Sequence, residues 1–167
     1  DYIQLIRGES IPTLEEAFDA VIDSTMLEVI WLDIKGNPDI FNIINPFIEA
    51  ANKKAIQKNR KLKIYAGLPT DDVVKEFKEF KNYTDFPSLC EISLDLTKEL
   101  NSKIWAPRWT LGEQDELVQD AHNNGIEVYT WTLDEEAFIR QYIRKQTFDG
   151  ILTNYPSLVA YQFYSQK

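Results

Sequence analysis

The sequence holds few of the residues from which many functional sites are built. It contains one cysteine, Cys90, and one histidine, His122, among 167 residues. A single cysteine excludes an internal disulfide and a cysteine-rich metal site, and its neighbours Leu89 and Ile92 predict a buried structural thiol. His122 falls in a helical stretch away from any predicted strand end, which favours a place at a helix boundary over a role as a general acid.

Long apolar runs, glycine-rich loops and an excess of positive charge are absent too. No apolar run approaches the roughly 18 residues of a membrane span, so none is predicted in this segment. No glycine-rich loop follows a strand, which leaves no sign of a nucleotide site. Acidic residues outnumber basic ones by 27 to 18, and the net charge of -9 would repel nucleic acid. Basic residues do gather at 53–63, where we expect them to lie at a helix C-terminus.

What is present is an alternation of strand and helix signals along the whole chain. Strands are predicted at 27–34, 62–67, 89–96, 103–106, 127–133 and 151–153. Helix starts are predicted at Thr13 with Glu16, at Asn45-Pro46, at 70–72, at Thr110 with Glu113, and at Thr132 with Glu135. Such units imply a parallel sheet with covered faces.

The predicted fold class is therefore α/β, an incomplete TIM-type barrel of parallel strands alternating with helices. An open, flavodoxin-like sheet is the alternative, and the lack of a glycine-rich phosphate loop counts against it. At 167 residues the chain is shorter than the roughly 250 residues of a complete barrel. We interpret residues 1–167 as one partial domain that lacks the first strands.

The most informative stretch is an apolar strand that ends in Asp33-Ile34-Lys35-Gly36. Residues two positions apart share a face of a strand, so Asp33 and Lys35 point the same way at its carboxyl end, where parallel α/β folds build their sites. A carboxylate and an ammonium group suit a metal ion and a phosphate oxygen. An ion pair that faces solvent is the alternative interpretation.

Two further groups of residues follow predicted extended segments. Arg108 and Trp109 stand in an aromatic and cationic run just after 103–106, where an arginine can bind a phosphate with two hydrogen bonds or stack on a ring. Trp131 lies near the end of the strand at 127–133. It is a candidate for a pocket wall, with core packing as the alternative.

Four segments in order resemble the glycerophosphodiester phosphodiesterase family: IPTLEEAF at 11–18, LEVIWLDIKG at 27–36, GIEVYTWTLD at 125–134 and DGILTNYP at 149–156. Members of that family typically read I-P-T-L-E-E, I-E-I-K, V-x-x-W-T-V and D-G-I-x-T-D-x-P. The resemblance runs from about Arg7 to Pro156. It implies a barrel fold and the metal-dependent hydrolysis of a small-molecule phosphodiester to glycerol phosphate and an alcohol. Bacterial members commonly reside outside the cytoplasm.

The resemblance also implies roles for individual residues. Lys35 matches the family's lysine, whose ammonium would stabilise negative charge on the phosphoryl oxygens. Asp33 stands where the family has a metal-binding glutamate, and an oxygen ligand selects Ca²⁺ or Mg²⁺ as the divalent cation. Trp131 corresponds to the tryptophan of the W-T motif beside the substrate. Arg108 and Trp109 are added as secondary substrate contacts.

Departures from the family pattern shape the functional expectation. The H-R-G strand, the paired metal-binding Glu and Asp and the second histidine of the family do not occur in this sequence. We expect the chain to be inactive alone and to need the N-terminal part of the same protein. Asp33 in place of glutamate, and Asn154 in place of aspartate, favour an alternative: a non-catalytic degenerate barrel that binds a phosphorylated ligand or a protein partner.

Overall fold

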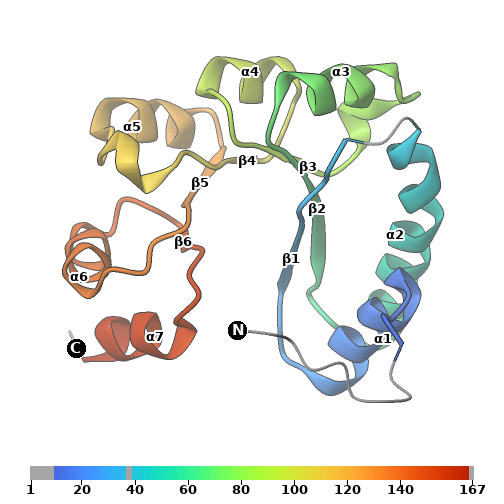
Figure 1. The fold of residues 1–167 in the computed structure, drawn as a ribbon, viewed down its shortest axis with the longest axis horizontal. Coiled ribbons are helices and arrows are strands. Elements are labelled where there is room, and N and C mark those ends of the chain that lie inside the picture. The colour runs from blue at the N-terminus through green and yellow to red at the C-terminus, as the bar shows by residue number, and fades with distance from the viewer. Residues whose placement is uncertain (1–9, 37–38, 166–167) are drawn as a thin grey trace. The chain divides into compact units, whose positions relative to one another are not determined.

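A computed structural model describes residues 10–36 and 39–165, so residues 7–9, where the resemblance begins, lie outside it. Within these ranges, six strands form one sheet whose order is the order of the chain (Figure 1). The strands are β1 (Val29–Leu32), β2 (Lys63–Leu68), β3 (Ser88–Cys90), β4 (Ile104–Trp105), β5 (Glu127–Thr130) and β6 (Gly150–Ile151). This sequential parallel order, with a helix after each strand, confirms the predicted class of an incomplete TIM-type barrel.

The helices connect the strands. They are α1 (Leu14–Ser24), α2 (Ile40–Gln57), α3 (Asp71–Glu79), α4 (Leu94–Glu99), α5 (Asp115–Asn123), α6 (Glu136–Lys145) and α7 (Pro156–Tyr164), with short 3-10 turns η1 (Tyr83–Asp85) and η2 (Trp109–Leu111). In the described ranges, no helix combines the length and the apolar character that a membrane span requires. The chain divides into two compact units, Asp1–Ile30 with Phe41–Ile64 and Trp31–Ile40 with Tyr65–Lys167.

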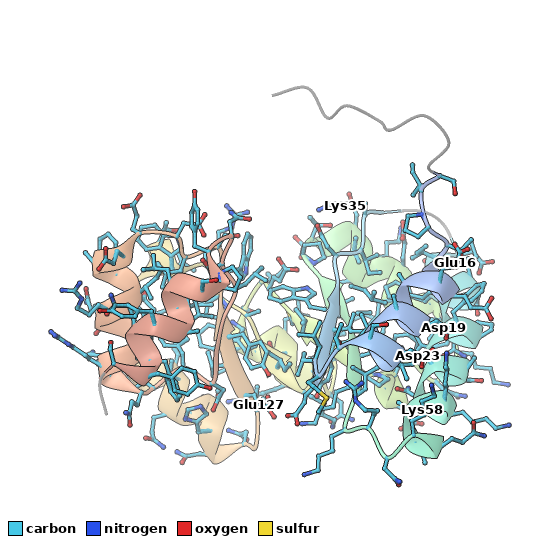
Figure 2. All side chains as sticks on the ribbon, turned by 90° about the horizontal axis from the view of Figure 1, so that it is seen from below. Glu16, Asp19, Asp23, Lys35, Lys58 and Glu127 are labelled. Carbon is cyan, nitrogen blue, oxygen red and sulfur yellow. The ribbon has the colours of Figure 1, made fainter. Side chains whose placement is uncertain are left out.

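In the first unit, ion pairs join α1 to the end of α2. Lys54 Nζ lies 2.6 Å from Asp19 Oδ1 and 2.9 Å from Asp23 Oδ2, and Lys58 pairs with Asp23 as well (Figure 2). Hydrogen bonds from the two lysines lower the pKa of the Asp23 carboxyl. Arg60 donates to two main-chain carbonyls within 22–27. Lys54, Lys58 and Arg60 therefore contact α1 and the loop that follows it.

In the second unit, parallel register brings the strand ends level. Leu68 pairs with Cys90, Cys90 with Trp105, and Trp105 with Val128. Figure 1 shows α3, α4, α5 and α6 on the outer side of β3 to β6. Val128 and its neighbours from α4 and α5 are buried there, in a cluster of Leu94, Trp105, Val118, Ala121, Ile126 and Val128. The buried Cys90 of β3 confirms the predicted structural thiol.

Several predicted boundaries are confirmed and others are wrong. Thr13 and Glu16 do form a capping box. The helix predicted to start at Asn45-Pro46 begins instead at Ile40 and continues through Pro46. Its buried residues Phe41, Ile44, Ile48, Ala51 and Ala55 form one continuous apolar face. Burial of this face outweighs the main-chain hydrogen bond that proline removes.

The extended segment predicted at 89–96 is also wrong beyond Cys90. Ser93 caps α4, because its side chain accepts a hydrogen bond from the N–H of Leu96, and the chain turns into a helix. The predicted capping boxes at Thr110 and Thr132 do not form either. The helices there start later, after Gln114 and Glu135, and neither of these residues makes a side-chain cap.

Gly67 on β2 allows a close approach by the neighbouring strand, and this makes its replacement testable. A Cβ atom on Gly67 would come within 2.5 Å of Trp31 Nε1 and 3.0 Å of the Leu32 carbonyl oxygen. We expect Gly67→Ala to lower the free energy of unfolding by about 1–3 kcal/mol, because the added methyl group overpacks the site. Urea denaturation monitored by tryptophan fluorescence measures this change.

Gly36→Ala is the matched control for this substitution. The nearest atom to a Cβ on Gly36 is Glu76 Oε1 at 3.8 Å, an ordinary contact. Its effect should stay within about 0.5 kcal/mol. Equal stability of the Gly67→Ala variant and the unsubstituted protein would contradict the packing described for Trp31.

Candidate functional site

A pocket of about 620 Å³ opens at the carboxyl ends of the strands. Each of the six strands is followed, within three residues, by a residue that lines this pocket. The lining residues are Trp31, Asp33, Ile34, Lys35, Gly36, Pro69, Thr70, Val73, Glu91, Arg108, Trp131, Thr132 and Leu152. The volume falls within the range of small-molecule sites, and the position is the one at which parallel α/β barrels carry their chemistry.

Asp33 and Lys35 lie together on the wall that follows β1. The Lys35 ammonium donates to the Asp33 carboxylate at 2.8 Å, and the two side chains are 80% and 65% exposed. Figure 2 shows Lys35 at the opposite end of the strands from Glu127, which begins β5. An ion pair this exposed contributes roughly 0–1 kcal/mol, so Lys35 can turn from Asp33 to an incoming anion at little cost.

Arg108 and Trp131 form another part of the wall. The two residues pair in parallel beyond β4 and β5, and the Arg108 guanidinium lies 4.8 Å from the centroid of the Trp131 ring. The indole is fixed in turn, because its Nε1–H donates to the Ala106 carbonyl at 2.7 Å. The guanidinium covers one face of the indole, which orients Arg108 beside the pocket.

Trp109 does not line the pocket. Its ring packs on Phe138 at 4.8 Å between centroids, and its carbonyl accepts a hydrogen bond from the Tyr142 hydroxyl. Arg108 has extended backbone, and successive residues of an extended chain point in opposite directions. Arg108 therefore faces the pocket, and Trp109 does not.

Glu91 also lines the pocket, although the sequence analysis did not select it. It directly follows β3, and its N–H donates to the carbonyl of Leu68 at the end of β2. Burial raises the pKa of the Glu91 carboxyl to about 7, with a further increase from the charge of Asp33 and partial compensation by Lys35 and Arg108. Its position directly after a strand could have identified Glu91 as a candidate site residue. It was not selected because the strand was predicted to continue from 89 to 96, which placed Glu91 inside it.

The single histidine lies elsewhere. His122 is in the last turn of α5, and its Nε2 is 2.9 Å from Asp149 Oδ2. The same carboxylate oxygen accepts the N–H of Val128 at 2.7 Å. These contacts tie α5 to the starts of β5 and β6, and the place of His122 in the last helical turn is the helix boundary predicted for it.

Carboxylates that could hold a metal ion are few in the pocket. Asp33 and Glu91 are its acidic lining residues. Across residues 10–36 and 39–165, no three His, Cys, Asp or Glu side chains gather as a ligand set. A divalent cation bound at Asp33 would need water, substrate oxygens or further groups to complete the six to eight oxygen ligands of Ca²⁺ or the octahedron of Mg²⁺.

Comparison with protein families agrees with this architecture. The sequence profile of the glycerophosphoryl diester phosphodiesterase family matches residues 4–158, nearly the whole chain. The chain therefore belongs to the glycerophosphoryl diester phosphodiesterase family, as the motifs predicted. A comparison with curated proteins finds no significant match.

Solved structures share the fold. A glycerophosphodiester phosphodiesterase from Parabacteroides distasonis is 19% identical with a TM-score of 0.67, and 98% of this chain aligns with 68% of it. A candidate glycerophosphoryl diester phosphodiesterase from Silicibacter pomeroyi is 21% identical with a TM-score of 0.62, over 93% of this chain and 57% of that one. An Oleispira antarctica phosphodiesterase, solved with its product sn-glycerol-3-phosphate, is 14% identical with a TM-score of 0.58, over 92% of this chain and 61% of that one.

The chain thus spans between 57% and 68% of the length of these structures. Identities of 14% to 21% establish a common fold. The activity or product of each solved protein is a property of that protein.

The raised pKa of the Glu91 carboxyl predicts how the stability of the protein depends on pH. The unfolded chain ionises Glu91 near its ordinary pKa of 4.5, whereas the folded chain retains the proton up to about pH 7. Folding is therefore penalised progressively between these values, and the penalty is complete above pH 7. We expect Glu91→Gln to be more stable than the unsubstituted protein above pH 7 and to lose this advantage below about pH 4.

Urea denaturation across this pH range measures the difference between the two proteins. Glu99→Gln is the control, since that exposed carboxylate pairs with Lys78 on the surface. A difference for Glu91→Gln that does not change with pH would show that the folded protein does not perturb this carboxyl.

Proposed function

We propose that this chain supplies the phosphate-binding side of an active site that hydrolyses glycerophosphodiesters to glycerol phosphate and an alcohol. The observation that carries the proposal is the convergence of Lys35 and Arg108 on one pocket at the strand ends. Family membership supports the reaction class. The Oleispira antarctica phosphodiesterase, which has the same fold, was solved with sn-glycerol-3-phosphate.

Each cation has a distinct part in this proposal. Lys35 is exposed and loosely paired, so its ammonium follows the phosphoryl oxygens and offsets the negative charge that grows on them during attack. Arg108 is held on Trp131, so its planar group presents two N–H donors in a fixed direction to a second oxygen. Trp131 then serves mainly to position Arg108, because the guanidinium already covers one of its faces.

A divalent cation, Ca²⁺ or Mg²⁺, belongs to the proposal with Asp33 as the ligand from this chain. The cation would neutralise charge on the phosphate when bound. Asp33 is available for ligation, because its bond to Lys35 is exposed and inexpensive to break.

The two histidines that the family resemblance implies as acid and base have no counterpart among the described residues that line the pocket. The only histidine of the sequence pairs with Asp149 at the other end of the strands. This observation favours the second candidate function, a binding barrel for a phosphorylated ligand. In the enzymatic proposal, the histidines that transfer protons come from outside these 167 residues.

Binding of a phosphate monoester tests the part of the proposal that both candidates share. We expect the protein to bind sn-glycerol 3-phosphate in isothermal titration calorimetry, and Lys35→Ala to weaken this affinity at least about tenfold, because a charged hydrogen bond is lost. Lys81→Ala is the control, since Lys81 is exposed beyond the far end of α3. Undiminished binding by the Lys35→Ala variant would remove Lys35 from the phosphate site.

Turnover separates the two candidates. We expect the 167-residue protein to release at most traces of glycerol phosphate from glycerophosphodiesters with Ca²⁺ or Mg²⁺, because acid and base catalysis usually contributes about 10² to 10⁴-fold. An enzymatic assay of released sn-glycerol 3-phosphate measures this. Rapid release that Lys35→Ala abolishes would show that the chain contains its own proton-transfer groups.

A further inference from the structure

Glu91 is the charged residue of the pocket to which the proposed function gives no task. Its side chain is partly buried, and no residue in the described ranges forms a hydrogen bond with its carboxyl group. The other acidic residue of the wall, Asp33, already has Lys35 as a partner at 2.8 Å. A partly buried carboxyl that has no hydrogen-bond partner is costly to desolvate further, so a ligand that displaces its water must form a hydrogen bond with it or bind more weakly.

The chemistry of a carboxyl group restricts what that ligand can offer. A phosphate diester has no hydrogen to donate, and its negative charge is repelled by a carboxylate. A hydroxyl group donates to a carboxylate and accepts from a protonated carboxyl. Burial, which brings the pKa of Glu91 to about 7, makes both forms present at neutral pH. A hydroxyl pairs with either form.

The pocket therefore offers contacts to two kinds of ligand group. Lys35 and Arg108 suit a phosphate, and Glu91 suits a hydroxyl. The two cations follow β1 and β4, and Glu91 follows β3, which lies between these strands in the sheet. A molecule that carries a phosphate and free hydroxyls satisfies both kinds at once. An alkyl phosphate of the same length satisfies only the cations.

We propose that Glu91 determines specificity by contacting a free hydroxyl of the polyol part of the ligand, so that the pocket selects hydroxyl-bearing phosphate esters over alkyl phosphates. This inference rests on the proposed function, since it assumes that the phosphate lies on Lys35 and Arg108. Selectivity arises because the alkyl chain displaces water from Glu91 without replacing its hydrogen bonds.

Calorimetric titration of the 167-residue protein with two ligands tests the inference. The ligands are sn-glycerol 3-phosphate and propyl phosphate, which has the same carbon chain and no hydroxyl. We expect the unsubstituted protein to bind the glycerol ester at least about tenfold more tightly. Glu91→Leu should bring this ratio close to one, and Glu91→Gln, which retains a donor and an acceptor, should keep most of it.

Glu99→Gln provides the control for the loss of a carboxylate elsewhere, on the surface of α4. The ratio of the two affinities is the deciding quantity, because a purely structural role for Glu91 would weaken both ligands equally. An unchanged ratio in Glu91→Leu, or equal binding of both ligands by the unsubstituted protein, overturns the specificity role and leaves the phosphate site of Lys35 intact. If neither ligand binds, the proposed function and this inference fail together.

Discussion

Parallel pairing in chain order is the constraint on which the pocket depends. Because each strand runs in the same direction as its neighbour, the residue that follows a strand comes to the same edge of the sheet as the residue that follows the next one. Lys35, Glu91 and Arg108 are far apart in sequence, yet they line one pocket for this reason. Helices α4 and α5 pack on the outer face of β4 and β5, and this packing holds the strand ends that carry the pocket in place.

The charges of the pocket are balanced in two different ways. Asp33 and Lys35 neutralise one another near solvent, where rearrangement costs little. Arg108 is held on an aromatic ring and Glu91 is partly buried, so neither can move as freely. A mobile cation beside fixed polar groups suits a ligand whose phosphate changes charge distribution during a reaction, while its alcohol part stays in one orientation.

Sequence reasoning succeeded where a side chain follows a clear strand and failed where the local pattern was ambiguous. Lys35 and Trp131 could be placed because period-two alternation fixes the face on which they lie. Glu91 was missed because the apolar positions after Cys90 imitate a longer strand, although Ser93 caps a helix there. Pro46 was misjudged because tertiary burial of one helix face, which no local rule contains, outweighs a lost hydrogen bond.

The central claim, that a phosphate ester binds at the carboxyl ends of the strands, is tested most directly by the tryptophan indoles. The sequence has four tryptophans, of which Trp31 and Trp131 line the pocket while Trp105 and Trp109 do not. Indole N–H signals in ¹H–¹⁵N NMR spectra, assigned with single Trp→Phe variants, report on each ring. Titration with sn-glycerol 3-phosphate should shift the signals of the first two and leave the others nearly unchanged. Shifts confined to Trp105 and Trp109, or no shift at millimolar ligand, would contradict the account.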